Sequence, residues 1–345
     1  MRFHCEVPNN RIELIMRKPV CATLAVMMSL LFSPLSHADR AWESYKARFF
    51  KPEGRIVDTG NGGVSHTEGQ GFAMLMAVAN DDKATFDKLW QWTDSQLKNK
   101  ENGLFYWRYN PAESNPVADK NNAADGDVLI AWALLKADAR WHDKRYSAAS
   151  DAITKALIDH SVIRYAGYRV MLPGVQGFKL EGEVVLNPSY FVFPAWQAFS
   201  RRSHLPVWRD LIKDGKRLLG KMGSGKANLP TDWVSLASGG KLAPAKGWPP
   251  RMSYDAIRVP LYVAWSDKQS PLLTPWKAWF GQFSREQTPA WVNVTTNEYA
   301  PYMMEGGLLA VRDFTMGQSS GEPEITSKDD YYSASLKMLV WIAQQ

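Results

Sequence analysis

Apolar residues recur every three or four positions along most of this sequence, a spacing typical of amphipathic α-helices. The segment 68–80, for example, places Phe72, Leu75 and Met76 on one helical face. The segment 127–141 is apolar nearly all round, which predicts an inner, buried helix. No alternation of strands and helices accompanies these segments, so a parallel α/β sheet is excluded.

The same period predicts further helices, separated by stretches rich in glycine, proline and asparagine. They are 84–96, 146–163, 188–201, 206–222, 254–265, 276–283, 306–314 and 331–343. Alternating strands are scarce, and the best short candidates are 163–170 and 183–186. We therefore predict a single all-α domain of about ten to twelve helices. Its inner and outer helices suggest hairpins arranged in a ring, although periodicity alone does not establish that the ring closes.

Residues 1–38 are expected to be a signal peptide, followed by one catalytic domain over 39–345. Arg17 and Lys18 precede an apolar run at 19–32, and the small-residue pattern Ser36-His37-Ala38 follows it. The run is shorter than the roughly 18 apolar residues of a membrane span, which favours cleavage over anchoring. Met16 is an alternative start.

Both cysteines of the chain, Cys5 and Cys21, lie in this predicted leader. Once the leader is removed, no thiol is left for a disulfide, a thiolate metal site or a cysteine nucleophile. An exported protein without disulfides is typical of a bacterial envelope, so we expect a secreted or periplasmic protein with no membrane association after cleavage.

The charge and the aromatic content narrow the function. The net charge of +6 is modest and not clustered, which disfavours binding to nucleic acid. The chain has 15 Trp and 13 Tyr. Aromatic residues mostly fill cores, but their flat faces also stack on sugar rings. The excess is consistent with a carbohydrate-binding groove without proving one.

The first candidate acid is Glu68. Thr67 or Ser65 is expected to cap a helix here, with Glu68 in its first turn. An acid at this end stabilises a helix dipole by about 0.3–1 kcal/mol. However, Gly69 and Gly71 disfavour a helix and allow close approach of a ligand. The residues alone leave both roles of Glu68 open.

Two further segments carry acids. Asp125 is a candidate N-cap and Asp127 a candidate first-turn acid of the apolar inner helix. The two flank Gly126, but the other ligands of an EF-hand are missing, so calcium is not expected. Asp255 and Arg258 are three residues apart and share a helical face, for which a salt bridge is the favoured interpretation from spacing alone.

Metal-ligand spacing is absent among the histidines, and no Gly-x-Ser-x-Gly elbow is present for a serine nucleophile. His66 is expected to form a hydrogen bond beside Glu68 rather than to act in catalysis.

Taken together, the acidic segments resemble glycoside hydrolase family 8, and most closely bacterial endoglucanases of the kind that accompany cellulose synthase operons. The matching motifs are Thr67-Glu68-Gly69-Gln70-Gly71-Phe72-Ala73-Met74, Ala123-Ala124-Asp125-Gly126-Asp127 and Tyr254-Asp255-Ala256-Ile257-Arg258-Val259, supported by Asn187-Pro188-Ser189-Tyr190 and Pro230-Thr231-Asp232-Trp233. In this order they span most of the chain. One departure is Ala124, where the family usually has Ser or Thr.

This resemblance implies an (α/α)6 barrel and hydrolysis with inversion at the anomeric carbon. It implies that Glu68 is the general acid and Asp255 the general base that activates water. Asp125 is implied to hold the sugar at the cleavage point.

Three more residues gain a role from the resemblance. Arg258 and Tyr190 are implied to lie near that sugar or the water, and Trp107 to be a stacking platform. No metal or organic cofactor is implied. The expected substrate is a β-1,4-glucan, hydrolysed internally by a monomer with a functional link to the cellulose synthase machinery.

Three alternatives remain. Chitosanase or xylanase activity on the same fold is not separated by these motifs, although the positive net charge disfavours a cationic substrate. A non-catalytic glycan-binding protein would have lost an acid, yet all three are present. A structural helical-repeat scaffold would show a fixed period of about 34–47 residues, and none is found.

Overall fold

The structure is a computed structural model that describes residues 37–318, 321 and 323–345. Residues 1–36 of the predicted signal peptide, with Cys5 and Cys21, lie outside the described residues. The described part is a mainly helical single domain, as the hydrophobic period predicts. Its α-helices are α1 His37–Phe49, α2 Thr67–Ala79, α3 Lys83–Leu97, α4 Ala124–Trp141, α5 Lys144–His160, α6 Phe193–Ser203, α7 Pro206–Leu219, α8 Arg258–Ser266, α9 Thr274–Phe280, α10 Gly306–Thr315 and α11 Tyr331–Gln344.

Helix α4 is deeply buried over its first three turns. Its residues from Val128 to Leu134 are all at most 4% exposed. The helix ends at His142, which takes a left-handed conformation with φ 56° and donates its N–H to the Asp138 carbonyl. Such a residue closes a helix by satisfying one of its free carbonyls. The prediction of an inner helix over 127–141 is therefore confirmed.

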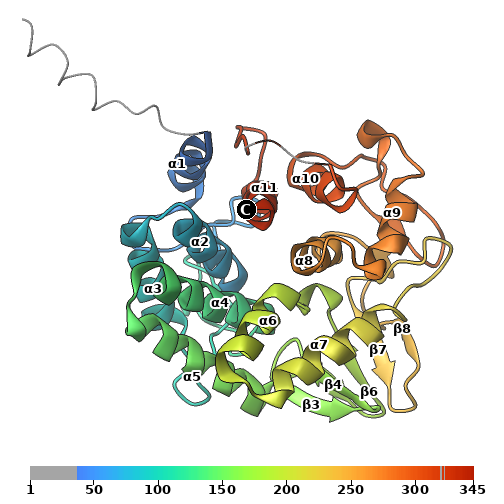
Figure 1. The fold of residues 1–345 in the computed structure, drawn as a ribbon, viewed down its shortest axis with the longest axis horizontal. Helices are drawn as coiled ribbons and strands as arrows, with labels where there is room; N and C mark the ends of the chain where they lie inside the picture. The colour runs from blue at the N-terminus through green and yellow to red at the C-terminus, as the bar shows by residue number, and fades with distance from the viewer. Residues whose placement is uncertain (1–36, 319–320, 322) are drawn as a thin grey trace, which may run out of the picture. The chain divides into compact units, whose positions relative to one another are not determined.

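Successive helices pack in two sets of contacts. α2 packs against α3, α4 against α5, and α6 against α7, as neighbours in sequence. In addition α2 packs against α4, α4 against α6, α6 against α8, α8 against α10, α10 against α11, and α11 against α2. Figure 1 shows α3, α5, α7 and α9 lying outside α4, α6 and α8. The apolar sides of the even-numbered helices thus face the core.

The expectation of an all-α domain is too simple, because short antiparallel sheets connect the helices. The largest has the strand order β5-β6-β7-β8. The strands are β1 Ser65–His66, β2 Arg108–Tyr109, β3 Val162–Tyr165, β4 Tyr168–Met171, β5 Lys179–Leu180, β6 Glu183–Leu186, β7 Val234–Ala237, β8 Leu242–Pro244, β9 Arg251–Met252 and β10 Val292–Asn293. Strand β6 matches the prediction at 183–186. The predicted strand at 163–170 is instead a hairpin of β3 and β4, which turns at Ala166 and Gly167, both with positive φ.

Two predicted helices begin later than expected. The segment 188–201 starts with the short 3₁₀ helix η1 Pro188–Tyr190, and α6 begins only at Phe193. Asn187 accepts a hydrogen bond from the Ser189 N–H and so stabilises this separate turn. Likewise, residues 254–257 form a turn, and α8 begins at Arg258. Both early turns carry residues of the candidate site.

No helix in the described ranges is long and apolar enough to cross a membrane.

Candidate active site

Arg258, the first residue of α8, gathers the three acids that the sequence singles out. Its side chain is 1% exposed. Nη1 donates to Glu68 Oε2 and, at 3.2 Å, to Asp125 Oδ2. Nη2 donates to Asp255 Oδ1 and to Ser189 Oγ, each at 3.0 Å. The predicted salt bridge between Asp255 and Arg258 therefore exists, and it is one part of a larger cluster.

The start of α2 is brought against the start of α4 by two glycines. A Cβ atom at Gly126 would lie 2.1 Å from Thr67 Oγ1, and one at Gly71 would lie 2.5 Å from Leu129 Cβ. Both distances are too short for any larger residue. These glycines therefore permit close packing of α2 against α4, and this packing brings Glu68 close to Asp125.

Gly69 has a similar role on the other side of α2. A Cβ atom there would lie 2.6 Å from the hydroxyl of Tyr331, at the start of α11. That hydroxyl lies 3.5 Å from Glu68 Oε1. The prediction that Gly69 and Gly71 allow approach of a ligand is wrong, because neighbouring elements of the protein occupy the space beside both glycines.

The expected helix caps are also different. His66 holds the N-cap position of α2 and makes no side-chain capping bond, so neither Ser65 nor Thr67 caps the helix. At α4 the N-cap is Ala123, and Asp125 lies inside the first turn. Asp125 therefore has no capping role to explain its presence.

The acids of the cluster differ in exposure. The side chains of Glu68, Asp125 and Asp255 are 20%, 3% and 35% exposed. Burial raises the pKa of Asp125 to about 7; Arg258 opposes the shift, while Glu68 and Asp255 add to it. Asp125 thus carries a proton for part of the time near neutral pH, and the more open pair can reach a bound molecule.

A short turn supplies the remaining partners of Asp255. Asn187 Nδ2 donates to Asp255 Oδ2 at 3.1 Å, so both oxygens of this carboxylate accept hydrogen bonds. Ser189 Oγ donates to Asn187 Oδ1 at 2.6 Å and accepts from Arg258. Burial raises the pKa of the neighbouring Tyr190 hydroxyl well above its ordinary value, and the negative charges of Asp125 and Asp255 add to the shift.

Trp107 lies next to the start of α2, as a groove platform would. The Thr67 N–H donates to the Trp107 carbonyl at 3.0 Å. The Trp107 ring stacks on His66, with centroids 5.7 Å apart and 5° between the planes. Trp107 Nε1 donates to Asp119 Oδ2 at 2.7 Å. Asp58 Oδ2 lies 3.9 Å from His66 Nδ1, too far for a hydrogen bond, and the negative charge of Glu68 also acts on the His66 ring. His66 therefore supports the Trp107 ring.

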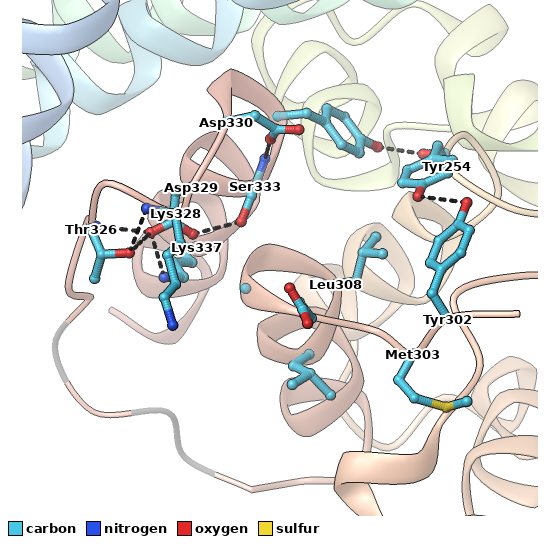
Figure 2. A pocket seen from close by; sticks show the side chains of 14 residues that line it. Tyr254, Tyr302, Met303, Leu308, Thr326, Lys328, Asp329, Asp330, Ser333 and Lys337 are labelled. Carbon is cyan, nitrogen blue, oxygen red and sulfur yellow. Dashed lines mark hydrogen bonds and ion pairs between the residues drawn. The ribbon is translucent and has the colours of Figure 1, made fainter. Parts of the chain in front are cut away.

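A cavity of about 580 Å³ adjoins the turn that carries Asp255. Tyr254 and Tyr302 line it, and their hydroxyls lie 3.3 Å apart (Figure 2). They are 45% and 46% exposed. The Tyr332 hydroxyl donates to the Tyr254 carbonyl and fixes the backbone beside Asp255. The cavity thus presents aromatic surface at the residue before Asp255, whereas its lining does not include the three acids themselves.

Among the described residues, no group of three or more His, Cys, Asp or Glu side chains is arranged to hold a metal ion.

Comparison with known proteins decides the family. The model of glycosyl hydrolases family 8 matches residues 16–345. The chain belongs to glycoside hydrolase family 8.

Relatives within family 8 agree in sequence and fold. An endoglucanase of Cellulomonas uda is 60% identical over 312 residues, which are 90% of this chain and 87% of that protein. The crystal structure of the family 8 endoglucanase Cel10 from Klebsiella pneumoniae is 65% identical, with a TM-score of 0.88, over 88% of this chain and 98% of that one. The endo-β-1,4-glucanase CMCax of Acetobacter xylinum is 40% identical, with a TM-score of 0.86, over 90% and 98%. The resemblance drawn from the motifs is confirmed.

The family 8 motif departs from its usual form at Ala124, and the structure shows what supports the backbone there. Ala124 is fully buried, and its N–H donates to the Pro173 carbonyl at 2.8 Å. The next residue, Asp125, still reaches Arg258. The loss of a side-chain hydroxyl therefore leaves the acid in place.

Sequence reasoning missed four residues of this site. Asn187 and Ser189 were visible only as part of a supporting motif, and Tyr254 only as the neighbour of Asp255. Tyr302 carried no signal at all. Its contact with the Tyr254 hydroxyl depends on the long segment between α9 and α10, whose path the hydrophobic period does not specify.

Proposed function

We propose that this family 8 chain is an endo-β-1,4-glucanase that hydrolyses internal bonds of cellulose with inversion. The observation that carries the proposal is the convergence of Glu68, Asp125 and Asp255 on one buried guanidinium. Two carboxyl groups on opposite sides of a glycosidic bond are what this hydrolysis requires. The names of the relatives in Cellulomonas uda and Acetobacter xylinum support the substrate class.

Asp255 is proposed as the general base. Both of its oxygens accept hydrogen bonds, one from Arg258 and one from Asn187, and these two bonds fix the orientation of the carboxyl group. It is also the most exposed acid of the cluster, which leaves room for a water molecule. In an inverting hydrolase the two catalytic carboxyls lie about 6.5–9.5 Å apart to accommodate that water.

Glu68 is proposed as the general acid that protonates the leaving oxygen. Its carboxyl lies between Arg258 and the Tyr331 hydroxyl and is partly open. Asp125 is almost fully buried, and with a pKa of about 7 it can donate as well as accept a hydrogen bond. We assign it to a hydroxyl of the sugar at the cleavage point, where Arg258 and Tyr190 also lie.

Two aromatic surfaces extend the proposed groove. Trp107 adjoins Glu68 through the start of α2, whereas Tyr254 adjoins Asp255 and continues to Tyr302. Flat aromatic rings offer apolar faces on which pyranose rings can stack. A substrate that meets aromatic surface on both sides of the acids extends beyond the cleaved bond in both directions, as an internal cut in a polysaccharide requires.

We also propose that the helices form an (α/α)6 barrel and that the enzyme is exported from the cytoplasm. The packing of α2, α4, α6, α8, α10 and α11, each against the next and the last against the first, supports an (α/α)6 barrel. The apolar run and small-residue pattern before Asp39 support export to the periplasm or beyond. A monomeric state and a functional link to cellulose synthesis rest on the family resemblance.

The direct test is a comparison of substrates. The protein without residues 1–38 is incubated with carboxymethylcellulose, chitosan and xylan, and the release of reducing ends is measured. Preferential hydrolysis of carboxymethylcellulose, lost in Glu68→Gln, is the expected result. Faster hydrolysis of chitosan or xylan would assign the chain to the alternative activities of this fold.

A further inference from the structure

Asp232 holds the turn that carries Asp255 from both sides. Its Oδ1 accepts hydrogen bonds from the Ser253 N–H at 2.9 Å and from the Ala256 N–H at 2.8 Å. Its Oδ2 accepts from the Ser253 hydroxyl. Ser253, two residues before Asp255, and Ala256, directly after it, are thus both bonded to the Asp232 carboxylate. Asp255 itself is not a partner in these bonds.

The backbone around Asp232 makes further hydrogen bonds outside the turn 253–256. The Asp232 N–H donates to the Arg251 carbonyl at 2.8 Å, and the Thr231 hydroxyl donates to the Trp233 carbonyl at 2.6 Å. Strand β7 begins directly after this segment, at Val234, and pairs with β6 and β8. Asp232 therefore connects the turn to the four-stranded sheet rather than to the helices.

The turn needs such a support because its own hydrogen bonds are few. The Ile257 N–H donates to the Ser253 carbonyl, and the Arg258 N–H donates to the Asp255 carbonyl, each at 3.0 Å. These bonds shape the backbone after Asp255. The N–H groups of Ser253 and Ala256 point toward Asp232 instead, so that carboxylate replaces the partner that regular structure would provide.

An acid at this position has an electrostatic cost. Burial raises the pKa of Asp232 to about 6, and repulsion from the nearby charge of Asp255 contributes to the shift. An apolar residue would avoid that repulsion but would leave two backbone donors without an acceptor. The hydrogen bonds to the turn are therefore the feature that accounts for a carboxylate here.

We propose that Asp232 is a positioning residue for the hydrolytic reaction: it fixes the turn 253–256 so that the Asp255 carboxylate meets the attacking water in the right orientation. The proposal rests on the proposed role of Asp255 as general base. A misplacement of about 1 Å in a catalytic group can reduce a rate about 10²-fold. Loss of the anchor is expected to act on kcat, because the carboxylate of Asp232 bonds to the turn that carries Asp255.

The test compares Asp232→Ala with Asp232→Asn on a cello-oligosaccharide. Asp232→Ala is expected to lower kcat about 10- to 100-fold, with KM changed less than about threefold. Asp232→Asn is expected to retain at least about a third of kcat, because the amide oxygen can accept the same two N–H bonds.

A matched control variant is Asp214→Ala, on the outer helix α7. Asp214 Oδ2 likewise accepts a hydrogen bond from a backbone N–H, that of Arg169, at 2.8 Å. Neither Asp214 nor Arg169 bonds to Glu68, Asp125 or Asp255. Asp214→Ala is expected to lower the melting temperature about as much as Asp232→Ala while leaving kcat unchanged. Equal kcat values for Asp214→Ala and Asp232→Ala would overturn the proposal, and so would a folded Asp232→Asn that is as slow as Asp232→Ala.

Two further variants keep the outcome decisive. If Asp232→Ala does not fold, Ser253→Ala removes one of the three bonds alone and is expected to lower kcat about two- to fivefold; an unchanged kcat would contradict the positioning role. Azide is expected to restore activity to Asp255→Ala by replacing the activated water, but not to Asp232→Ala. Full activity of Asp255→Ala without azide would refute the base assignment itself, a failure distinct from that of Asp232.

Discussion

Two acids at the start of α4 lie two residues apart and have opposite surroundings. Asp125 and Asp127 are 2% and 0% exposed, and burial raises the pKa of each to about 7. Asp125 faces the guanidinium of Arg258, which it shares with two other acids. Asp127 faces a loop and accepts bonds from the Phe105 N–H at 2.9 Å and Asn122 Nδ2 at 2.8 Å.

The difference shows that burial and a raised pKa do not by themselves mark a catalytic acid. The partners of Asp127 are neutral donors within one loop, which also carries Trp107. The Trp107 N–H donates to the Asn121 carbonyl within that loop, and the Thr67 N–H donates to the Trp107 carbonyl and ties the loop to the start of α2. Asp127 therefore stabilises the loop that carries Trp107, whereas Asp125 belongs to the cluster of acids around Arg258. Mutations can distinguish the acid cluster around Arg258 from the loop that Asp127 supports.

The largest losses of hydrolytic activity are expected from mutations in the acid cluster around Arg258. Glu68→Gln and Asp255→Asn keep shape and remove proton transfer, which typically contributes about 10²- to 10⁴-fold to a rate. Each variant is expected to lose nearly all hydrolysis while retaining fold and glucan binding, measured by circular dichroism and calorimetry. Activity above about a tenth of the unmodified enzyme in either variant would remove that residue from its role.

The next comparison exchanges the neighbouring acids. Asp125→Asn is expected to reduce kcat/KM at least about tenfold, because it alters the carboxyl group that we propose binds a hydroxyl of the sugar at the cleavage point. Asp127→Asn is expected to change kcat/KM less than about threefold but to cost about 1–3 kcal/mol of stability, because its amide places a donor against Asn122. Both variants are assayed in parallel by kinetics and by urea unfolding. A larger catalytic loss in Asp127→Asn would break the comparison.

The pH dependence of stability tests the loop side. The pKa of Asp127 is about 7 in the folded protein and 3.8 ordinarily, so the folded state holds its proton more tightly. Stability from this group is complete below about pH 4 and is lost as the pH rises through 7. Asp127→Asn should therefore show a shallower fall of melting temperature as the pH is raised from about 5 to about 8. An unchanged slope would mean that Asp127 ionises freely when folded.

The smallest effect is expected at the platform that Asp127 supports. Trp107→Ala is expected to weaken binding of a long cello-oligosaccharide by about 1 kcal/mol, roughly fivefold, with little change in melting temperature. Trp208 is fully buried and serves as the control. Trp208→Ala should cost about 3–5 kcal/mol of stability without a specific loss of affinity. Unaltered affinity of Trp107→Ala combined with a large loss of stability would assign Trp107 to the core.

Sequence periodicity predicted several long helices to within a few residues. α4, α10 and α11 follow the expected ranges closely, because their apolar period is uninterrupted. It failed at the starts of α6 and α8, where Asn187 and Asp255 lie in turns stabilised by side chains. The strands β7 and β8 were not predicted, although β6, which is as short as β7, was.

The candidate acids were found by resemblance, but their arrangement was not predictable from spacing. Glu68 and Asp125 lie 190 and 133 residues from Arg258 in the chain. Spacing revealed only the pair of Asp255 and Arg258, which are three residues apart. A bond between segments so distant depends on the packing of α2, α4 and α8 together, which no local pattern specifies.

The measurement that tests the central claim most directly is the configuration of the first product. If Glu68 protonates the glycosidic oxygen while Asp255 directs water to the opposite face of the sugar, a β-linked chain yields the α-anomer first. Proton NMR of a fresh cello-oligosaccharide digest, recorded before mutarotation, should therefore show the α signal growing ahead of the β signal. An initial β signal would mean that one carboxylate forms a covalent glycosyl-enzyme, and it would contradict the assignment of Asp255 as the base that activates water.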